Sequence, residues 1–317
     1  MRRWIGLFIF TLLCAIAYAE KPEQKVGIAL YLNDITRIQP QEEIIELEAT
    51  IFLRWQSEKK GVKDQYFYGN QVDDALKTMW WPYFIFLDTR GTTQVTHKAM
   101  KISNNGMVEY MAKYTLSIET ALNMHKFPFD TQTINIQIAP FGPMPYRIHY
   151  YLLNDKIGIN PVAHIEEWDL TGTKNKISAQ NENQYQLSLN YQRKSGYYLY
   201  KVFLPMLIIV FISYMVLWLP RQPAINRLAV IITAMLTIVA FQWAVTSDVP
   251  KVSYITFLQA MVLFFFIMVG LKAILVVIGE SVKEAEKYKL MHWSRIIYPV
   301  VLLLGIIIIS WIWFSIY

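Results

Sequence analysis

The stretch that decides how this chain is organised is Phe127-Pro128-Phe129-Asp130-Thr131-Gln132. It lies midway along a chain whose two parts differ in character. Up to about residue 197 the sequence alternates between apolar and polar residues, as a soluble β-domain does, and long apolar segments begin after that point. A short proline-containing loop in this position suggests an element that joins an outer domain to a membrane domain.

The outer part carries the signals of a β-sandwich. Turn residues at 88–91 and 104–106 punctuate it at hairpin spacing. The clearest runs with a period of two are 44–55, 106–112, 133–138 and 185–191. We therefore expect an immunoglobulin-like sandwich of about ten strands, with one short helix near Gln71 to Met79.

Four apolar segments follow the sandwich. Each is close to the ~20 residues that cross the hydrocarbon core of a bilayer. They run over about 198–219, 224–245, 253–278 and 296–317. The composition agrees, because 54% hydrophobic and 17% charged residues are too apolar for a purely soluble protein. The predicted fold class is a β + α membrane protein, an extracellular β-sandwich followed by a four-helix transmembrane bundle.

The N-terminus resembles a secretion signal. Arg2 and Arg3 precede the apolar run 4–17, and Ala17-Tyr18-Ala19 has the small-x-small form that signal peptidase cuts. We expect a signal peptide at 1–19, an outer domain at 20–197 and a pore domain at 198–317. An uncleaved N-terminal anchor is the alternative. With the N-terminus exported, the C-terminus lies outside too, and the basic residues that flank the spans face the cytoplasm: Arg221, Arg227, Lys283, Lys287, Lys289 and Arg295.

Several function classes are disfavoured. Cys14, within the predicted signal, is the only cysteine, so the mature chain would have no disulfide, thiol chemistry or cysteine metal site. The net charge of +6 is scattered, which argues against nucleic acid as a partner. No catalytic motif occurs, and four histidines stand far apart: His97, His125, His149 and His164. We expect neither an enzyme nor a cofactor or metal.

The second apolar segment carries a stripe at helical spacing. Its members are small or polar at one end and include bulky Leu236 and Trp243 at the other: Ala229, Thr233, Leu236, Ala240, Trp243 and Ser247. Such a helix could line water and close a pore by dewetting. Close packing inside an ordinary bundle is the alternative. One such helix cannot enclose a conduit, so a channel would require a ring of subunits.

These features together resemble one known family. The mature chain is similar to the pentameric ligand-gated ion channels, the Cys-loop receptor superfamily, and in particular to their cysteine-free bacterial branch. The stretch 127–132 matches the family's signature loop, and Thr120 and Ile134 stand where animal members have cysteines. Further segments match in order: Trp80-Trp81-Pro82, Arg193, Pro205, Arg227-Leu228, Met235-Leu236-Thr237 and Val249-Pro250-Lys251.

The resemblance implies a gating mechanism. Asp130 and Arg193 would form a partly buried ion pair at the domain junction. The loop from Phe127 through Pro128 and Phe129 would press on the linker 247–254, which includes Pro250 and Lys251. The partners it implies are a homopentamer, membrane lipids, permeant inorganic ions and a small-molecule or proton agonist. The location would be a bacterial inner membrane, with the outer domain and the C-terminus in the periplasm.

The resemblance also implies an agonist site between subunits, lined by aromatic residues. By the resemblance, Ile85 and Ala139 stand where amine-gated bacterial relatives have carboxylates, which disfavours a simple amine agonist. Gating by protons or hydroxide, or by a small aromatic or anionic ligand, stays open. By position, the ligand-binding candidates are Tyr31, Phe86, Phe141 and Tyr185, with Arg90 and Arg147 for an anion. Core or interface packing is the alternative for each aromatic residue.

Ion selectivity is less defined by the sequence. Asp248, at the outer end of the pore helix, would form a ring of five carboxylates and favour cations. The cytoplasmic end has Ile225-Asn226-Arg227 where cation channels often have an acidic ring. An anion-selective channel, a membrane-anchored sensor without conductance and a small transporter are the alternatives. The transporter would typically show internal repeats or broken helices, and the sequence shows neither.

Overall fold

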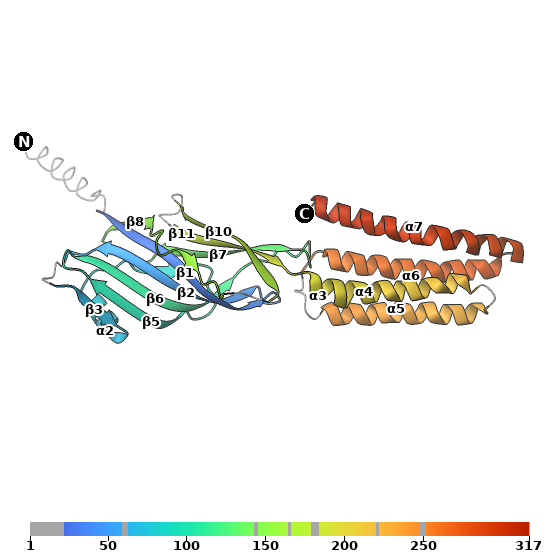
Figure 1. Cartoon of the computed structure of the whole chain (residues 1–317), viewed down its shortest axis with the longest axis horizontal. Helices are drawn as coiled ribbons and strands as arrows, with labels where there is room; N and C mark the ends of the chain where they lie inside the picture. The colour runs from blue at the N-terminus through green and yellow to red at the C-terminus, as the bar shows by residue number, and fades with distance from the viewer. Residues whose placement is uncertain are drawn as a thin grey trace, which may run out of the picture.

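The computed structural model describes residues 22–58, 63–142, 145–163, 166–178, 184–219, 222–246 and 252–316. These residues form an elongated molecule with a β-sandwich at one end and a helix bundle at the other (Figure 1). The predicted fold class is confirmed. The predicted signal peptide, with Cys14, lies outside the described residues, as does His164.

Two sheets build the sandwich. The larger has the order β3-β5-β6-β2-β1-β8 with β9 beside β1, and the smaller has the order β10-β11-β7-β4. The larger sheet contains β1 (Glu23–Gln39), β2 (Ile44–Gln56), β3 (Gln65–Tyr68), β5 (Gln94–Ile102), β6 (Met107–Glu119), β8 (Arg147–Leu152) and β9 (Gly158–Ile159). The smaller contains β4 (Phe84–Phe86), β7 (Thr131–Pro140), β10 (Trp168–Ser178) and β11 (Gln184–Arg193). The short helix α2 (Asn70–Lys77) lies close to its predicted position.

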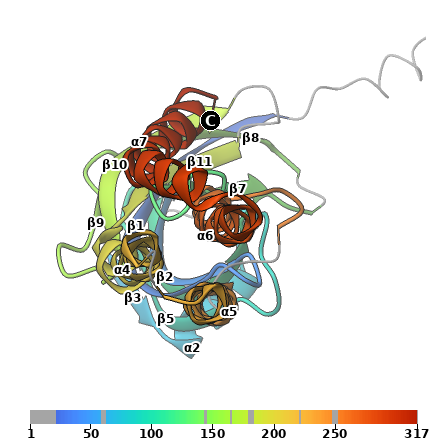
Figure 2. The same ribbon diagram turned by 90° about the vertical axis from the view of Figure 1, so that its right-hand side faces the viewer.

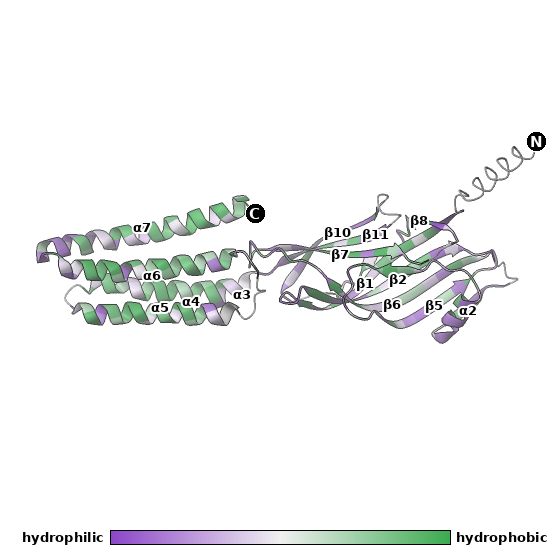
Figure 3. Cartoon of the chain, turned by 180° about the vertical axis from the view of Figure 1, so that it is seen from behind, coloured by the Kyte–Doolittle hydropathy of each residue, from purple (hydrophilic) through white to green (hydrophobic). Residues whose placement is uncertain are grey.

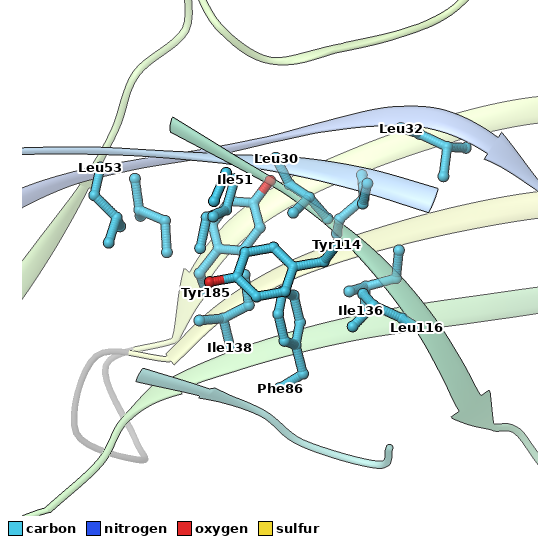
Figure 4. Close-up of a cluster of buried hydrophobic side chains, with 14 of the residues drawn as sticks. Leu30, Leu32, Ile51, Leu53, Phe86, Tyr114, Leu116, Ile136, Ile138 and Tyr185 are labelled. Atoms are coloured by element: carbon cyan, nitrogen blue, oxygen red, sulfur yellow. The ribbon is translucent and has the colours of Figure 1, made fainter. Parts of the chain in front are cut away.

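The core lies between the two sheets. Alternate residues of β2 and β6 are buried, because successive side chains of a strand point to opposite faces. Leu30 and Ile51 of the larger sheet thus meet Ile136 and Ile138 of the smaller one (Figure 4). Phe86, Tyr114 and Tyr185 fill the same layer (Figure 4).

The membrane domain consists of four long helical segments. The first begins with α3 (Gly196–Tyr198), passes through a π-helical turn at Leu199–Phe203 and continues as α4 (Leu204–Met215) and a 3₁₀ turn at Val216–Trp218. The others are α5 (Ala224–Thr246), α6 (Phe257–Ser281) and α7 (Glu284–Ile316). All four are long and apolar enough to cross a membrane. In Figure 3, which colours the ribbon by hydropathy, most of the ribbon of these helices is apolar, whereas apolar and polar residues are mixed along the strands of the sandwich.

Two predicted boundaries differ from the observed ones. Helix α6 begins at Phe257 and not near 253, because a capping box starts it there. The Thr256 hydroxyl accepts a hydrogen bond from the Gln259 backbone N–H, and the Gln259 side-chain oxygen accepts one from the Thr256 backbone N–H. Helix α7 begins at Glu284 and not near 296, because hydropathy detects only the apolar part of a helix whose first turns are polar. In the bundle, α5 and α7 lie on opposite sides of α4 and α6 (Figure 2).

The core position of Tyr185 gives a test of the sandwich. Its ring has 0% exposure and its hydroxyl donates to Asn175 Oδ1 at 2.5 Å. Tyr185→Phe should lower the free energy of unfolding by about 1 kcal/mol through the lost hydrogen bond. Tyr185→Ala should lower it by about 3–5 kcal/mol through the cavity that it leaves. Thermal unfolding of the purified protein measures both, and a wild-type midpoint for Tyr185→Ala would contradict the assigned core.

Candidate functional site

The signature loop lies where the sandwich meets the bundle. It connects β6 to β7, yet Phe127, with 1% exposure, packs in the hydrophobic cluster of the membrane domain and not in the sandwich core. Its ring meets Tyr198 edge-on, with 4.8 Å between the centroids. The Phe127-Pro128 peptide bond is cis. The loop therefore belongs to the sandwich by chain order and to the bundle by packing.

The expected ion pair between Asp130 and Arg193 is present at this junction, and it is buried more completely than expected. The Arg193 Nε donates to Asp130 Oδ1 at 2.8 Å, and its Nη2 donates to Oδ2 at 3.2 Å. The two side chains are 1% and 2% exposed. Gln132, also part of the opening stretch, donates its Nε2 to Asp130 Oδ2 at 2.6 Å. This fork geometry fixes both the distance and the direction of the contact.

Aromatic rings enclose the guanidinium of Arg193. Its Cζ lies 4.1 Å from the ring centroid of Trp168 and 4.9 Å from that of Phe127. Arginine stacks well on aromatic faces because its planar guanidinium is weakly hydrated. The pair therefore joins β11, β10 and the loop. Removing one partner of such a buried pair costs about 3–5 kcal/mol, because the other charge is left uncompensated.

The loop also caps helix α6. The first N–H groups of a helix have no partner within the helix. The Phe257 N–H donates to the His125 carbonyl at 2.8 Å, and the Leu258 N–H donates to the Phe127 carbonyl at 3.1 Å. Thr256 Oγ1 accepts a hydrogen bond from the third of these N–H groups, that of Gln259. The backbone of the sandwich loop thus supplies the N-terminal cap that α6 needs, so a movement of the loop acts directly on the third span.

Two residues at this junction, His125 and Trp313, were not predicted from the sequence as contacts, whereas Tyr254 ends the predicted linker 247–254. His125 stacks on Tyr254, with 3.8 Å between ring centroids and 2° between planes. The Tyr254 hydroxyl accepts the Met124 N–H at 2.9 Å, and the Trp313 Nε1 donates to the His125 carbonyl at 3.0 Å. Residues 125, 254 and 313 are far apart in the chain, and no local pattern marks them as neighbours. The loop thereby contacts α7 as well as α6.

Four predicted residues lie outside the described residues. They are Ser247 of the pore stripe, Asp248 for ion selectivity, and Pro250 and Lys251 for gating coupling. Within the linker, Tyr254 is the described residue that bonds to the loop. Contact between the loop and the remainder of the linker stays a prediction.

The predicted stripe of α5 lies on its exposed face. Ala229, Thr233 and Ala240 are exposed, and Leu236 and Trp243 are 65% and 85% exposed. The buried residues of α5 are on nearly the opposite side of the helix, at about 100° of rotation per residue: Arg227, Ile231, Ala234 and Ile238. Packing within the subunit therefore does not involve the stripe.

Two threonine hydroxyls of this helix, those of Thr233 and Thr237, bond within the helix. Thr233 Oγ1 donates to the Ala229 carbonyl at 2.9 Å and Thr237 Oγ1 donates to the Thr233 carbonyl at 2.8 Å. Such back-bonding satisfies a hydroxyl without a partner helix. The threonines can therefore present polar atoms to water on a face that is otherwise apolar.

Arg227 faces away from the stripe. It is 1% exposed, and its Nη2 donates to Glu280 Oε1 of α6 at 2.5 Å. Lys287 of α7 lies 2.9 Å from the same carboxylate oxygen. These contacts join α5, α6 and α7 at the end of the bundle far from the sandwich. The guanidinium of Arg227 is consequently not part of the exposed face of α5.

Two of the predicted ligand residues lie in the core of the sandwich. Tyr185 is fully buried between the sheets, and burial raises the pKa of its phenol. Phe86 is 7% exposed and packs on Tyr114 at 5.2 Å between centroids. Figure 4 shows both rings among aliphatic side chains of the two sheets. Their period-two positions pointed them inward, and a ligand outside the sandwich would not contact them in this structure.

The other ligand candidates lie at or near the surface, on different strands. Tyr31 of β1 is half-buried, and Gly158 leaves room for its ring, because a Cβ there would lie 2.8 Å from Tyr31 Cε2. Phe141 is 58% exposed. Arg90 is exposed and donates to the Glu42 carbonyl at 3.3 Å, and Arg147 is exposed on β8. A single chain does not bring them into one site.

An exposed aromatic group surrounds Phe141. The Phe141 N–H donates to the Tyr83 carbonyl at 3.0 Å, and Tyr83 is 53% exposed. The Tyr83 ring lies 4.1 Å from that of Trp81. Ile85 and Ala139 face each other in the register of β4 and β7, so these two positions supply no carboxylate beside the group. Within the described part of the chain, no cluster of three or more His, Cys, Asp or Glu residues could hold a metal ion.

Comparison with known proteins agrees with this arrangement. Residues 16–195 match the family model described as the neurotransmitter-gated ion-channel ligand binding domain. The chain is similar to a proton-gated ion channel of Gloeobacter violaceus, with 23% identity over 302 residues, which cover 92% of this chain and 83% of the relative. It is also similar to a gamma-aminobutyric acid receptor subunit beta of Lymnaea stagnalis, with 28% identity over 180 residues. That match covers 55% of this chain and 36% of the receptor subunit.

The family match covers the sandwich, and the Gloeobacter match, over 92% of this chain, includes residues of both the sandwich and the membrane domain. The expectation that the chain is not an enzyme is confirmed by this family. The single cysteine of the whole chain fits a branch without the bracketing disulfide. The chain therefore belongs to the pentameric ligand-gated ion channels of the Cys-loop superfamily, in their cysteine-free bacterial branch.

Proposed function

We propose that this ligand-gated ion channel is a homopentamer whose pore is lined by the stripe on α5 and conducts cations. The observation that carries the proposal is the exposure of the stripe on the face opposite the buried side of α5. The Thr233 and Thr237 hydroxyls donate within the helix and keep lone pairs that can accept further bonds, so this exposed face suits contact with water or with a neighbouring subunit. A closed ring of identical subunits supplies both.

We place a hydrophobic constriction of the proposed pore near Leu236. Below it the stripe contains Ala229 and Thr233, which leave room for hydrated ions. A ring of leucine side chains excludes water when the helices approach each other and admits it when they separate. Leu236 is 65% exposed and thus free to take this role in the assembly.

The cation preference rests on Asp248. Arg227 is buried and bonded to Glu280, so its charge does not face the stripe at the cytoplasmic end. Five Asp248 carboxylates at the outer end would concentrate cations there. An anion-selective channel is the alternative, and the exposed Ile225-Asn226 end of α5, which lacks an acidic ring, is the feature that favours it.

The stimulus acts on the outer domain in this proposal. Protons are one candidate, and the Gloeobacter relative is named a proton-gated ion channel. A small ligand between subunits is the other, with Phe141 and Tyr83 on one face and Tyr31 on the other. Signals would pass from the sandwich through the Asp130–Arg193 pair to α6 and α7, a two-state coupling. The protein would reside in a bacterial inner membrane with the sandwich in the periplasm.

Electrophysiology of the expressed chain tests the proposal. We expect currents in response to pH steps or to members of a small ligand panel. In asymmetric sodium chloride the reversal potential should follow the sodium gradient. A channel without current under all conditions, with ligand still bound by the outer domain, would favour the sensor reading.

Asp248→Asn should shift the reversal potential of these currents toward zero, because the ring of carboxylates would be lost. The matched control is Asp155→Asn, an exposed carboxylate of the outer domain beyond β8. A reversal potential that follows the chloride gradient in the wild-type protein would contradict the proposed cation selectivity.

Leu236→Ala should ease opening, because it removes bulk from the hydrophobic constriction. The stimulus needed for half-maximal current should fall by roughly tenfold, the effect of a difference of about 1.4 kcal/mol. Ile307→Ala, on the exposed face of α7, is the matched control and should leave the response unchanged. Equal responses from both variants would contradict the assigned pore face.

Asp130→Ala and Arg193→Ala should each permit assembly but strongly reduce the evoked current, because a buried charge is left uncompensated. Surface labelling measures assembly, and the current per surface channel measures gating. Lys194→Ala is the control, because the exposed pair of Lys194 with Asp169 should contribute at most about 1 kcal/mol. Wild-type currents from Asp130→Ala would remove the pair from the coupling pathway.

A further inference from the structure

Lys272 is a basic residue in the interior of the membrane domain. It lies on α6, well within a span whose residues are mostly apolar, and its exposure is 0%. An ionisable side chain is expensive to bury at membrane depth and is typically retained for a function. The channel mechanism proposed above makes no use of it.

The Lys272 side chain reaches across the bundle to α4. Its Nζ donates to the Val210 carbonyl at 3.2 Å and to the Ser213 hydroxyl. The Ser213 Oγ donates in turn to the Val210 carbonyl at 2.7 Å. Within the described residues, no carboxylate forms an ion pair with Lys272; its polar contacts are a backbone carbonyl and a hydroxyl.

Helix α7 completes the enclosure. The Lys272 Nζ lies 4.7 Å from the centroid of the Tyr298 ring. Tyr298 stacks on Tyr214 of α4, with 5.5 Å between centroids and 16° between planes. The Lys272 side chain therefore sits where α4, α6 and α7 meet.

A proline of α7 leads to further polar contacts between α7 and α4. Pro299 has no N–H, so the Arg295 carbonyl one turn earlier loses its partner within α7. The Tyr214 hydroxyl donates to that carbonyl at 2.8 Å. The Arg295 Nε donates to the Leu217 carbonyl at 2.9 Å. The last turns of α4 are thus held by polar contacts to both α6 and α7.

These last turns lead directly to the pore helix. The helical segment of α4 ends at Trp218, and α5 begins at Ala224. A shift of the end of α4 against α6 and α7 would therefore move the cytoplasmic end of α5. Residues that fix this packing can bias the position of the proposed pore face.

Burial of a cationic group rarely adds stability compared with an apolar side chain of similar shape. Polar groups of this kind instead penalise packings in which they lose their partners. We infer that Lys272 is a polar tie that selects how α4 packs against α6 and α7, and that it thereby biases the closed-to-open equilibrium of the channel. The gating half of this inference rests on the proposed function.

A thermal double-mutant cycle tests the tie without any agonist. Lys272→Met keeps the length of the side chain, and the purified oligomer should unfold at the wild-type temperature or above it. Ser213→Ala alone should lower the midpoint by several degrees, because Lys272 loses an acceptor. In the Lys272→Met background, Ser213→Ala should have no further effect.

Ser294→Ala is the matched control for the cycle. Ser294 is also a buried serine of a span, and its hydroxyl donates to the Met291 carbonyl of its own helix. Its effect should be equal in both backgrounds. Equal effects of Ser213→Ala in both backgrounds would overturn the tie, as would a loss of assembly in Lys272→Met, which would assign the residue a merely structural role.

Sodium flux into proteoliposomes tests the gating half. In the Leu236→Ala background, whose pore should leak without agonist, Lys272→Met should change the flux by about tenfold or more at equal protein per vesicle, as the loss of a charge-assisted hydrogen bond would. An unchanged flux would overturn the gating role. Absence of flux in the Leu236→Ala parent would contradict both the channel proposal and the gating role of Lys272. The thermal cycle would still test the polar tie between Lys272 and Ser213, because that measurement does not depend on conductance.

Discussion

The structure of the domain junction depends on the buried ion pair between Asp130 and Arg193, which connects the last strand of the sandwich to the loop that contacts the membrane domain. Arg193 ends the last strand of the sandwich, and Asp130 ends the loop whose carbonyl groups cap α6. The guanidinium lies against the rings of Trp168 and Phe127, and the Arg193 side chain is 2% exposed. The loop therefore cannot leave the junction without exposing an uncompensated charge, and α6 keeps its cap only while the loop stays in place.

The helices of the bundle differ in how many of their faces are packed within the subunit. Helices α4 and α6 are packed from two sides, by α5 and by α7. Polar contacts of Ser213 on α4, Lys272 on α6 and Tyr298 on α7 join three of these helices. Helix α5 buries one narrow face and leaves the opposite one exposed. Joined helices behind a helix with a free face are suited to tilting that helix as a unit, which is what a two-state pore requires.

The outer domain shows how closely core and ligand positions resemble each other in a sequence. Phe86 and Tyr185 have the residue type of a ligand box but lie on the inward face of their strands. Phe141 and Tyr83 have the same chemistry and are exposed, because they lie at a strand end and before a strand. Neighbouring residues of a strand point to opposite faces of the sheet. An alignment that is wrong by one position therefore assigns a core residue to the ligand site.

The sequence by itself determined the sandwich, the four spans, the stripe of α5 and the signature loop, because these depend on periodicity, segment length and a local motif. It also predicted that Asp130 and Arg193 pair, through the family resemblance. The tertiary structure alone decided that the loop caps α6, that His125 meets Tyr254 and Trp313, and that Lys272 reaches Val210 and Ser213. Those contacts join residues distant in the chain, and their energies depend on burial and direction, which no local pattern encodes.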